Sequence, residues 1–384
     1  MTRFLDGNRL TLLRCGAEYF PALEQAIDNA RQEIFLQTYI YQADEIGLRI
    51  AEAFKRATQR GVKVCLLIDG FGSYSLSKKF VRELQEARIN VLFYRPKISP
   101  FTLKRNRLRR LHSKIAVIDG KVAFVGGINI IDDFDGPKAE APRIDYAVRV
   151  EGPLLAQITH EVRRLWRRIE WLNFRRSRVR SGPTPVTHPF ADGVRAALVT
   201  RDNVLHRRDF ERVYMHAVTH AQSEILIANA YFLPGRAFRR ALISAVKRGV
   251  RVRLLLQGRM EYMLLFATHS FYNKLLANGI EIYEYEKGFM HSKVAVIDND
   301  WATVGSSNLD PFSFLLAREA NIVVRDKAFT AELRQDIEKT IREGAREIEV
   351  GYWKQLPFYR RGLSWVMYQV IRIMLSFIGY PGKH

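Results

Sequence analysis

The chain has 384 residues, 47% of them hydrophobic, and a formal net charge of +21. This length is typical of two domains, and the hydrophobic fraction is sufficient for two cores. The excess of Lys and Arg favours an anionic partner, either nucleic acid or an acidic membrane surface.

Two further features bear on the compartment. The two cysteines cannot form a disulfide framework, which favours a reducing compartment. No run of eighteen apolar residues is clear enough to predict a transmembrane helix. The N-terminal segment MTRFLDGNRL lacks the apolar core of a secretory signal. We therefore expect a basic globular protein that faces the cytosol.

The first part of the chain alternates between strand and helix patterns. Residues 33–41 predict a buried strand, residues 48–61 a helix that ends in a basic turn and a glycine, and residues 62–70 a second strand. A helix over 80–89 and a strand over 90–95 follow. Continuous apolar strands joined by helices are typical of right-handed βαβ units in a sheet covered on both faces.

The same order of elements recurs later in the chain. It comprises a strand over 224–232, a helix over 237–249, a strand over 250–258, a helix over 271–280 and a strand over 281–286. This repetition predicts two homologous α/β halves. The predicted divisions are an N-terminal half (1–172), an Arg-, Ser- and Pro-rich linker (173–189), a C-terminal half (190–349) and an apolar tail (350–384).

Each half also contains a polar motif inside an apolar strand pattern. The copies are LHSKIAVID and MHSKVAVID, which place polar residues at His112, Lys114, Asp119, His291, Lys293 and Asp298. Residues two apart on a strand project from the same face, so each histidine points the same way as its lysine. A glycine turn and an asparagine follow each histidine at the same spacing of 17 residues (112 to 129 and 291 to 308).

A lone histidine or lysine in a strand is usually a satisfied edge residue. That interpretation does not explain the same polar pattern occurring twice with matched spacing. Burying a lysine without a counter-charge costs roughly several kcal/mol, so two such lysines need a reason. Two histidines, two lysines and two asparagines are suited to a shared anion.

The doubled HxKxxxxD pattern, followed by GG or GS and an asparagine, resembles the phospholipase D superfamily over most of the chain. The segments FVGGIN, DYAVRVEGP and ATVGSSNLDPFS resemble bacterial cardiolipin synthases, in particular the B type. This resemblance implies two phospholipase D-like α/β halves, each a mixed β-sheet flanked by helices. It further implies one active site at their interface, with no metal or other cofactor.

The resemblance also implies an activity, which is phosphatidyl transfer between two phosphatidylglycerol molecules to give cardiolipin and glycerol. Phosphatidylethanolamine is an alternative donor. A neutral imidazole attacks phosphorus to give a phosphohistidine, and a second, protonated imidazole protonates the leaving alkoxide. Two histidines near pKa 6.5 can hold these opposite states if their environments differ. By resemblance His112 is the nucleophile and His291 the acid and base.

The remaining polar residues have supporting roles in this interpretation. The expected ligands of the phosphate oxygens are Lys114, Lys293, Asn129, Asn308 and Ser306. The family places an acidic residue about one strand after each motif to orient a histidine, and Asp145 and Glu319 occupy these positions. The motif aspartates Asp119 and Asp298 lie at strand ends, where we expect a turn or salt-bridge role and no proton transfer.

Two stretches favour contact with a membrane. Six basic residues surround the start of the first motif, namely Lys104, Arg105, Arg107, Arg109, Arg110 and Lys114. Each basic residue near an anionic leaflet contributes about 1 kcal/mol. The aromatic-rich tail predicts either a core helix or a helix lying in the interface. With the resemblance, this predicts a peripheral protein on the cytoplasmic face of the bacterial inner membrane, with anionic phospholipids as partners.

Three other functions remain open at this stage. They are a phospholipase D hydrolase with the same residues, a phosphodiesterase acting on nucleic acid, and a non-enzymatic lipid scaffold. The apolar tail argues against nucleic acid, and the two complete motifs argue against a scaffold. Weaker metal-site candidates are the pair His216 and His220, and the acidic residues Asp132, Asp133 and Asp135. Neither group has the ligand set of a metal site.

Overall fold

The computed structural model describes residues 2–95, 109–134, 141–173, 187–202, 208–259, 268–269, 271–310, 317–351, 362, 366 and 369–370. Most of the predicted linker and of the predicted tail lie outside these residues. The same is true of Lys104, Arg105, Arg107 and Asp135. Within the described part of the chain, no helix is long and apolar enough to cross a membrane.

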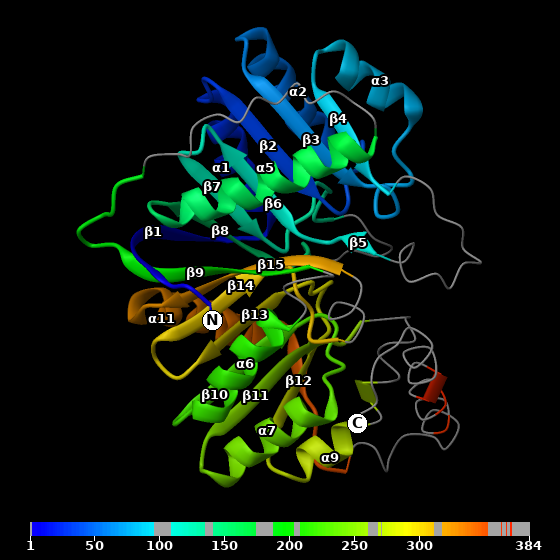
Figure 1. The fold of residues 1–384 in the computed structure, drawn as a ribbon. Helices are drawn as coiled ribbons and strands as arrows, with labels where there is room; N and C mark the ends of the chain where they lie inside the picture. Colours follow the sequence, from blue (N-terminus) through cyan, green and yellow to red (C-terminus); the bar gives the residue numbers. More distant parts are fainter. Residues whose placement is uncertain are drawn as a thin grey trace.

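The N-terminal half contains a mixed sheet with helices packed against it (Figure 1). Its strands are β1 (Leu5–Arg14), β2 (Glu33–Thr38), β3 (Lys63–Asp69), β4 (Asn90–Tyr94), β5 (Arg110–Leu111), β6 (Lys114–Ile118), β7 (Val122–Gly126) and β8 (Tyr146–Glu151). Its helices are α1 (Cys15–Asp28), α2 (Glu45–Gln59), α3 (Lys78–Glu86) and α5 (Leu154–Leu172). Strands β2, β3 and β4 are parallel, whereas β6, β7, β8 and β1 pair antiparallel.

The C-terminal half repeats this plan, with β10, β11 and β12 parallel and β13, β14, β15 and β9 antiparallel. Its strands are β9 (Val194–Arg201), β10 (Glu224–Asn229), β11 (Arg251–Gln257), β12 (Glu281–Tyr285), β13 (Lys293–Ile297), β14 (Trp301–Gly305), β15 (Ala317–Arg325) and β16 (Ala345–Glu347). Its helices are α6 (Asp209–His220), α7 (Arg236–Lys247), α9 (Tyr272–Leu276) and α11 (Lys327–Gly344). The two homologous α/β halves predicted from the sequence are confirmed.

The two sheets join where β1 pairs with β9, so their strands form one continuous order through the molecule (Figure 1). A shared hydrophobic core contains residues of both halves, including Val148, Leu165, Ile322 and Leu333. Helices α5 and α11 supply part of this core, whereas each half keeps a second core of its own. The halves are therefore fixed against each other by burial of apolar surface, the main favourable term in folding.

The predicted strand over 33–41 is longer than the observed β2, which ends at Thr38. Beyond it the backbone forms one isolated bridge, between Tyr41 and Ile130, and is also held by side chains. The N–H of Ile40 donates to Asn129 Oδ1 over 3.1 Å, and the N–H of Tyr41 donates to Ser73 Oγ over 2.8 Å. These bonds satisfy the buried amides and bring residues 39–41 next to the first polar motif.

The motif aspartates close the turn after β6 and after β13. Asp119 and Asp298 have positive φ angles of 53° and 51°, a conformation that Asp tolerates better than most residues. The carboxylate of Asp119 accepts the N–H groups of residues 31–33 over 2.8–2.9 Å. That of Asp298 accepts the N–H groups of residues 222–224 over 2.8–3.1 Å. Each carboxylate thus fixes the entry to the first parallel strand of its half.

We predict that Asp298→Ala lowers the free energy of unfolding by about 1–3 kcal/mol, because it removes the charged acceptor of three amides, of which that of Glu224 is partly buried. Burial opposes ionisation of Asp298, but the backbone hydrogen bonds from residues 222–224 hold its pKa below the usual value. Stability from this group should therefore be present at neutral pH and fall as the pH drops through its folded pKa. Chemical unfolding at two pH values measures both effects.

The matched control is Asp300→Ala, which removes an exposed ion pair with Arg325. Surface ion pairs contribute about 0–1 kcal/mol, so this variant should unfold almost like the parent. Equal losses in the two variants would contradict a special role for the turn aspartate.

Candidate active site

The two polar motifs meet at the boundary between the halves, and their histidines are oriented across it. His112 Nδ1, in the N-terminal half, lies 3.0 Å from Glu319 Oε2 in β15 of the C-terminal half. His291 Nδ1, in the C-terminal half, lies 2.6 Å from Asp145 Oδ2 in the N-terminal half. Each histidine is therefore paired with the carboxylate of the other half. The sequence predicted these carboxylates but not the exchange.

The backbone repeats this exchange. The N–H of His112 donates to the carbonyl of Arg318 over 3.0 Å, and the N–H of His291 donates to the carbonyl of Ile144 over 2.8 Å. The short strand β5 also pairs with β15 of the other half. Both the main chain and the ring of each histidine are thus held by the opposite half.

The hydrogen bonds define which ring nitrogen is available. A carboxylate oxygen accepts and does not donate, so Nδ1 of His112 carries a hydrogen and donates it. His291 Nδ1 lies 2.6 Å from Asp145 Oδ2 and 2.8 Å from Lys293 Nζ, and we assign its hydrogen to the shorter contact, with the carboxylate. His112 Nδ1 also lies 3.1 Å from the carbonyl oxygen of Ser306, a second acceptor. When each ring is neutral, its Nε2 therefore bears the lone pair.

Burial is the main influence on the histidine pKa values. It lowers the pKa of His112, against the attraction of Glu319. It lowers the pKa of His291 further, together with the nearby Lys293 ammonium. Burial alone would raise the pKa of Asp145, but Lys293 and His291 hold it below the usual value. Both imidazoles are accordingly neutral at pH 7 before a substrate binds.

The two motif lysines are buried beside the histidines. Lys114 Nζ donates to the His112 carbonyl over 2.7 Å, and Lys293 Nζ donates to the His291 carbonyl. Lys293 Nζ also lies 3.4 Å from Asp145 Oδ2. Burial lowers the pKa of Lys114 to about 7 and that of Lys293 to about 8, and the Lys293 ammonium further lowers the pKa of Lys114 across the boundary. Two buried amines near each other, each a cation when protonated, are chemically suited to an anion.

The predicted phosphate ligands differ in their surroundings. Asn129 is buried, and its Oδ1 accepts the N–H of Ile40. Asn308 is also buried, and its Oδ1 has no hydrogen-bond partner among the described residues. Ser306 does not face an open site, because its hydroxyl donates to Glu319 Oε2 over 2.6 Å. Its geometry is that of a residue that positions Glu319.

The equivalent of Ser306 in the first half is Gly127, and the difference has a steric cause. A Cβ atom at Gly127 would lie only 2.2 Å from Asp145 Oδ1. The glycine therefore leaves space for the carboxylate that pairs with His291. Ser306 instead supplies a hydroxyl to the carboxylate that pairs with His112.

The sequence did not single out Tyr39. Its ring lies 5.0 Å from that of His112, and Lys114 Nζ lies 5.4 Å from its centroid. A cation near an aromatic face is stabilised by the ring quadrupole. Tyr39 lies at the end of an apolar strand pattern, where the sequence shows no sign that the chain turns into the site.

The weaker candidates do not join this site. His216 and His220 stack on the surface of α6, with ring centroids 4.3 Å apart. The carboxylate of Asp133 accepts the N–H of Gly16, and that of Asp132 accepts the N–H of Phe134. Among the described residues, no cluster of three His, Cys, Asp or Glu side chains could hold a metal ion.

Known proteins match this chain along nearly its whole length. The family model described as cardiolipin synthase, phospholipase D-like domain, matches residues 23–166 and 214–341, one segment in each half. Cardiolipin synthase B of Escherichia coli K12 is 36% identical over 390 residues, which cover 99% of this chain and 91% of that protein. A probable cardiolipin synthase of Bacillus subtilis is 30% identical, over 93% of this chain and 69% of that protein.

A solved structure shares the fold. Phosphatidylserine synthase of Haemophilus influenzae superimposes with a TM-score of 0.71 at 14% identity, over 98% of this chain and 97% of that one. At this identity the likeness concerns the fold alone. Together, the match of the family model in both halves and the full-length relatives show that this chain belongs to the cardiolipin synthase family of phospholipase D-like proteins.

Proposed function

We propose that this chain is a cardiolipin synthase that transfers a phosphatidyl group from one phosphatidylglycerol to another. The observation that carries the proposal is the crossed pairing of His112 with Glu319 and of His291 with Asp145. Two histidines, each fixed at Nδ1, can present two Nε2 atoms to one phosphorus. Such a pair supplies a nucleophile and a proton carrier for a double displacement.

In the first step, Nε2 of His112 attacks the phosphorus of phosphatidylglycerol. The P–N bond forms, the bond from phosphorus to the glycerol oxygen breaks, and His291 gives its Nε2 proton to the departing alkoxide. In the second step, a hydroxyl of another phosphatidylglycerol attacks the phosphohistidine. His291 takes the proton of that hydroxyl, the P–N bond breaks, and cardiolipin leaves. Phosphatidylethanolamine could replace the donor, with ethanolamine leaving.

Charge in the site supports this order of events. His112 must be neutral to attack, and burial keeps its pKa low. His291 must gain a proton, and the negative charge of a bound phosphodiester favours the protonated form of a nearby imidazole. Asp145 would then stabilise the imidazolium, as in other oriented histidine sites. We assign binding of the non-bridging oxygens to Lys114, Lys293, Asn129 and Asn308.

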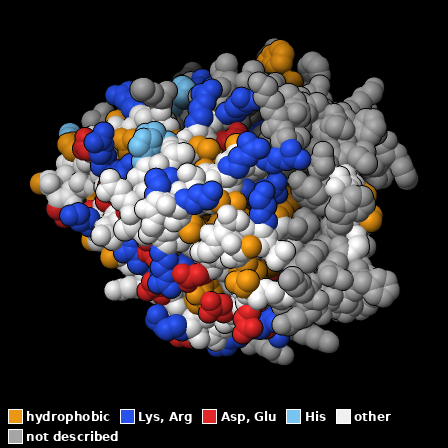
Figure 2. Space-filling model, turned by 90° about the horizontal axis from the view of Figure 1, so that it is seen from below, with side chains coloured by type: hydrophobic (Ala, Val, Ile, Leu, Met, Phe, Trp, Pro, Cys, Tyr) orange, Lys and Arg blue, Asp and Glu red, His pale blue; other side chains and the backbone are white. Residues whose placement is uncertain are grey.

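We further propose that the protein acts peripherally at the cytoplasmic face of the bacterial inner membrane. The net charge of +21 favours an anionic leaflet. Lys and Arg side chains gather over the upper part of the face shown in Figure 2. Helices α6 and α7 carry exposed basic residues, including Arg212, Arg236, Arg240 and Lys247.

The direct test is to incubate the protein with labelled phosphatidylglycerol in mixed micelles and to identify the products. We expect cardiolipin and free glycerol. Replacing either His112 or His291 with Ala should lower the rate by on the order of 10³-fold or more, since residues that act as a unit fail together. His160→Ala, which changes an exposed histidine of α5, is the matched control and should keep the parent rate.

Two results would contradict the proposal. Phosphatidic acid as the main product would identify a hydrolase. About half of the activity remaining in either histidine variant would show that the motifs work as separate sites.

The pH dependence provides a second test. With pKa values of about 7 for Lys114 and about 8 for Lys293, the lysines are charged below these values and lose their charge above them. As the lysines lose their charge, they attract the phosphodiester less strongly. The value of kcat/KM, which reports groups of the free enzyme, should therefore decline above pH 7–8. On the acid side it should hold below pH 6.5, because burial lowers the pKa of His112, the histidine that must stay neutral. His291 must be protonated, so a lower pH favours its active form.

The measurement is kcat/KM for a short-chain phosphatidylglycerol below its micelle concentration, so that surface charge on a bilayer plays no part. A rate that stays constant from about pH 6 to pH 10 would show that neither lysine titrates near neutrality.

A further inference from the structure

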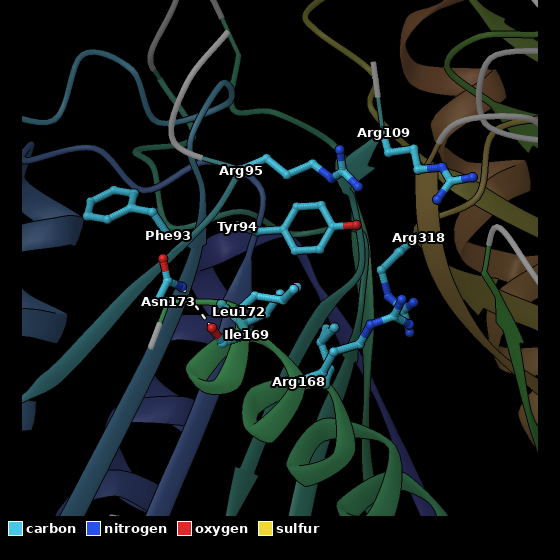
Figure 3. Close-up of a pocket in the computed structure, with 10 residues that line it drawn as sticks. Phe93, Tyr94, Arg95, Arg109, Arg168, Ile169, Leu172, Asn173 and Arg318 are labelled. Carbon is cyan, nitrogen blue, oxygen red and sulfur yellow. Dashed lines mark hydrogen bonds between the residues drawn. The ribbon is translucent and has the colours of Figure 1, made fainter. Parts of the chain in front are cut away.

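A second cationic pocket lies where β4, β5 and the end of α5 in the N-terminal half meet β15 of the C-terminal half (Figure 3). Its volume is about 210 Å³. The residues important here are Tyr94, Arg95, Arg109, Arg168, Leu172 and Arg318. In Figure 3 the Tyr94 hydroxyl points into the space that the four arginines surround. Within the described part of the chain, no Asp or Glu lines this pocket.

The charge of the pocket is only partly balanced. Arg318 is paired with Glu161 over 2.8 Å. Within the described residues, neither Arg95 nor Arg168 forms an ion pair. Guanidinium groups bind phosphate oxygens through two parallel N–H groups, and a phenol can donate one more hydrogen bond. Several arginines around one hydroxyl are therefore chemically suited to a phosphate.

The size and surroundings of the pocket indicate which phosphate it binds. Pockets that enclose a whole small-molecule ligand usually measure about 300–1,000 Å³, so this one is suited to a headgroup and not to a complete lipid. At its edge, the last turn of α5 exposes Trp171 (75%) and Leu172 (54%). An exposed Trp next to basic residues is typical of the membrane interface, where acyl chains can remain in the bilayer.

The pocket is separate from the catalytic histidines, because successive residues of a strand point to opposite faces. In β15, Glu319 points to His112, and the preceding Arg318 lines the pocket. The carbonyl of Arg318 in turn accepts the N–H of His112. One layer of backbone therefore lies between the two sites.

We propose that this pocket is a non-catalytic binding site for the phosphate headgroup of an anionic phospholipid. The inference rests on the proposed action on such lipids, and it assigns them a second place on the protein. A lipid held there would anchor the end of α5 at the membrane.

The test counts the lipids bound per chain by native mass spectrometry, with dihexanoylphosphatidylglycerol below its micelle concentration as the probe. All proteins carry His112→Ala, so that no transfer occurs. Adding R95Q and R168Q should reduce the number of bound lipids by one. Adding Tyr94→Phe alone should raise the Kd of the last lipid about tenfold. This factor corresponds to the loss of one hydrogen bond to a charged group.

The matched control is K327Q with R342Q, which removes the same charge from two exposed positions of α11. It should bind as many lipids as His112→Ala alone. With His112 restored, R95Q/R168Q should turn over the soluble lipid within about twofold of the parent rate, a change of less than about 0.5 kcal/mol. Equal thermal unfolding of the variants verifies that they fold.

Three outcomes would overturn the inference. An unchanged lipid count in R95Q/R168Q would show that the pocket binds none. Inorganic phosphate or glycerol 3-phosphate displacing the extra lipid at equal concentration would identify a site for soluble phosphates. Loss of turnover in R95Q/R168Q would place the pocket in the transfer site.

Failure of the parent to make cardiolipin, with the extra lipid still bound, would refute the proposed function and leave the pocket site intact.

Discussion

The exchange of carboxylates between the halves is the constraint on which the rest of the structure depends. His112 and His291 each rely on the opposite half for the partner of Nδ1 and for the acceptor of the main-chain N–H. Neither half alone can orient its own histidine. The shared core around α5 and α11, and the pairing of β1 with β9, hold the halves in the one arrangement that completes both pairs. The packing that stabilises the fold therefore also sets the geometry of the site.

Electrostatics makes this arrangement costly without a bound anion. Lys114 and Lys293 are buried near each other, and burial lowers the pKa of both. Among the described residues, the carboxylates paired with the motif histidines and lysines are those of Asp145 and Glu319. A phosphodiester anion supplies further negative charge, and in the transition state that charge grows on the non-bridging oxygens. In the proposed mechanism, the buried amines of Lys114 and Lys293 would stabilise this charge.

Local patterns allowed much of the fold to be predicted, since hydrophobic periodicity depends on neighbouring residues. The parallel strands β2–β4 and β10–β12 and their helices follow from it. The pairing of each histidine with a carboxylate of the other half could not be predicted from local patterns, because His112 and Glu319 are 207 residues apart. Tyr39 was missed because β2 ends early, at Thr38. Ser306 was predicted to bind phosphate, whereas its hydroxyl is used by Glu319, a contact that depends on the packing of β15.

The central claim is that two motifs make one site, with one nucleophile per chain. The most direct measurement is the number and position of phosphatidyl groups on the protein after reaction with short-chain phosphatidylglycerol and an alkaline quench, located by peptide mass spectrometry. The account predicts at most one group per chain, attached to His112, and none in His112→Ala. Two groups on one chain, or a group on His291 in the parent protein, would contradict it.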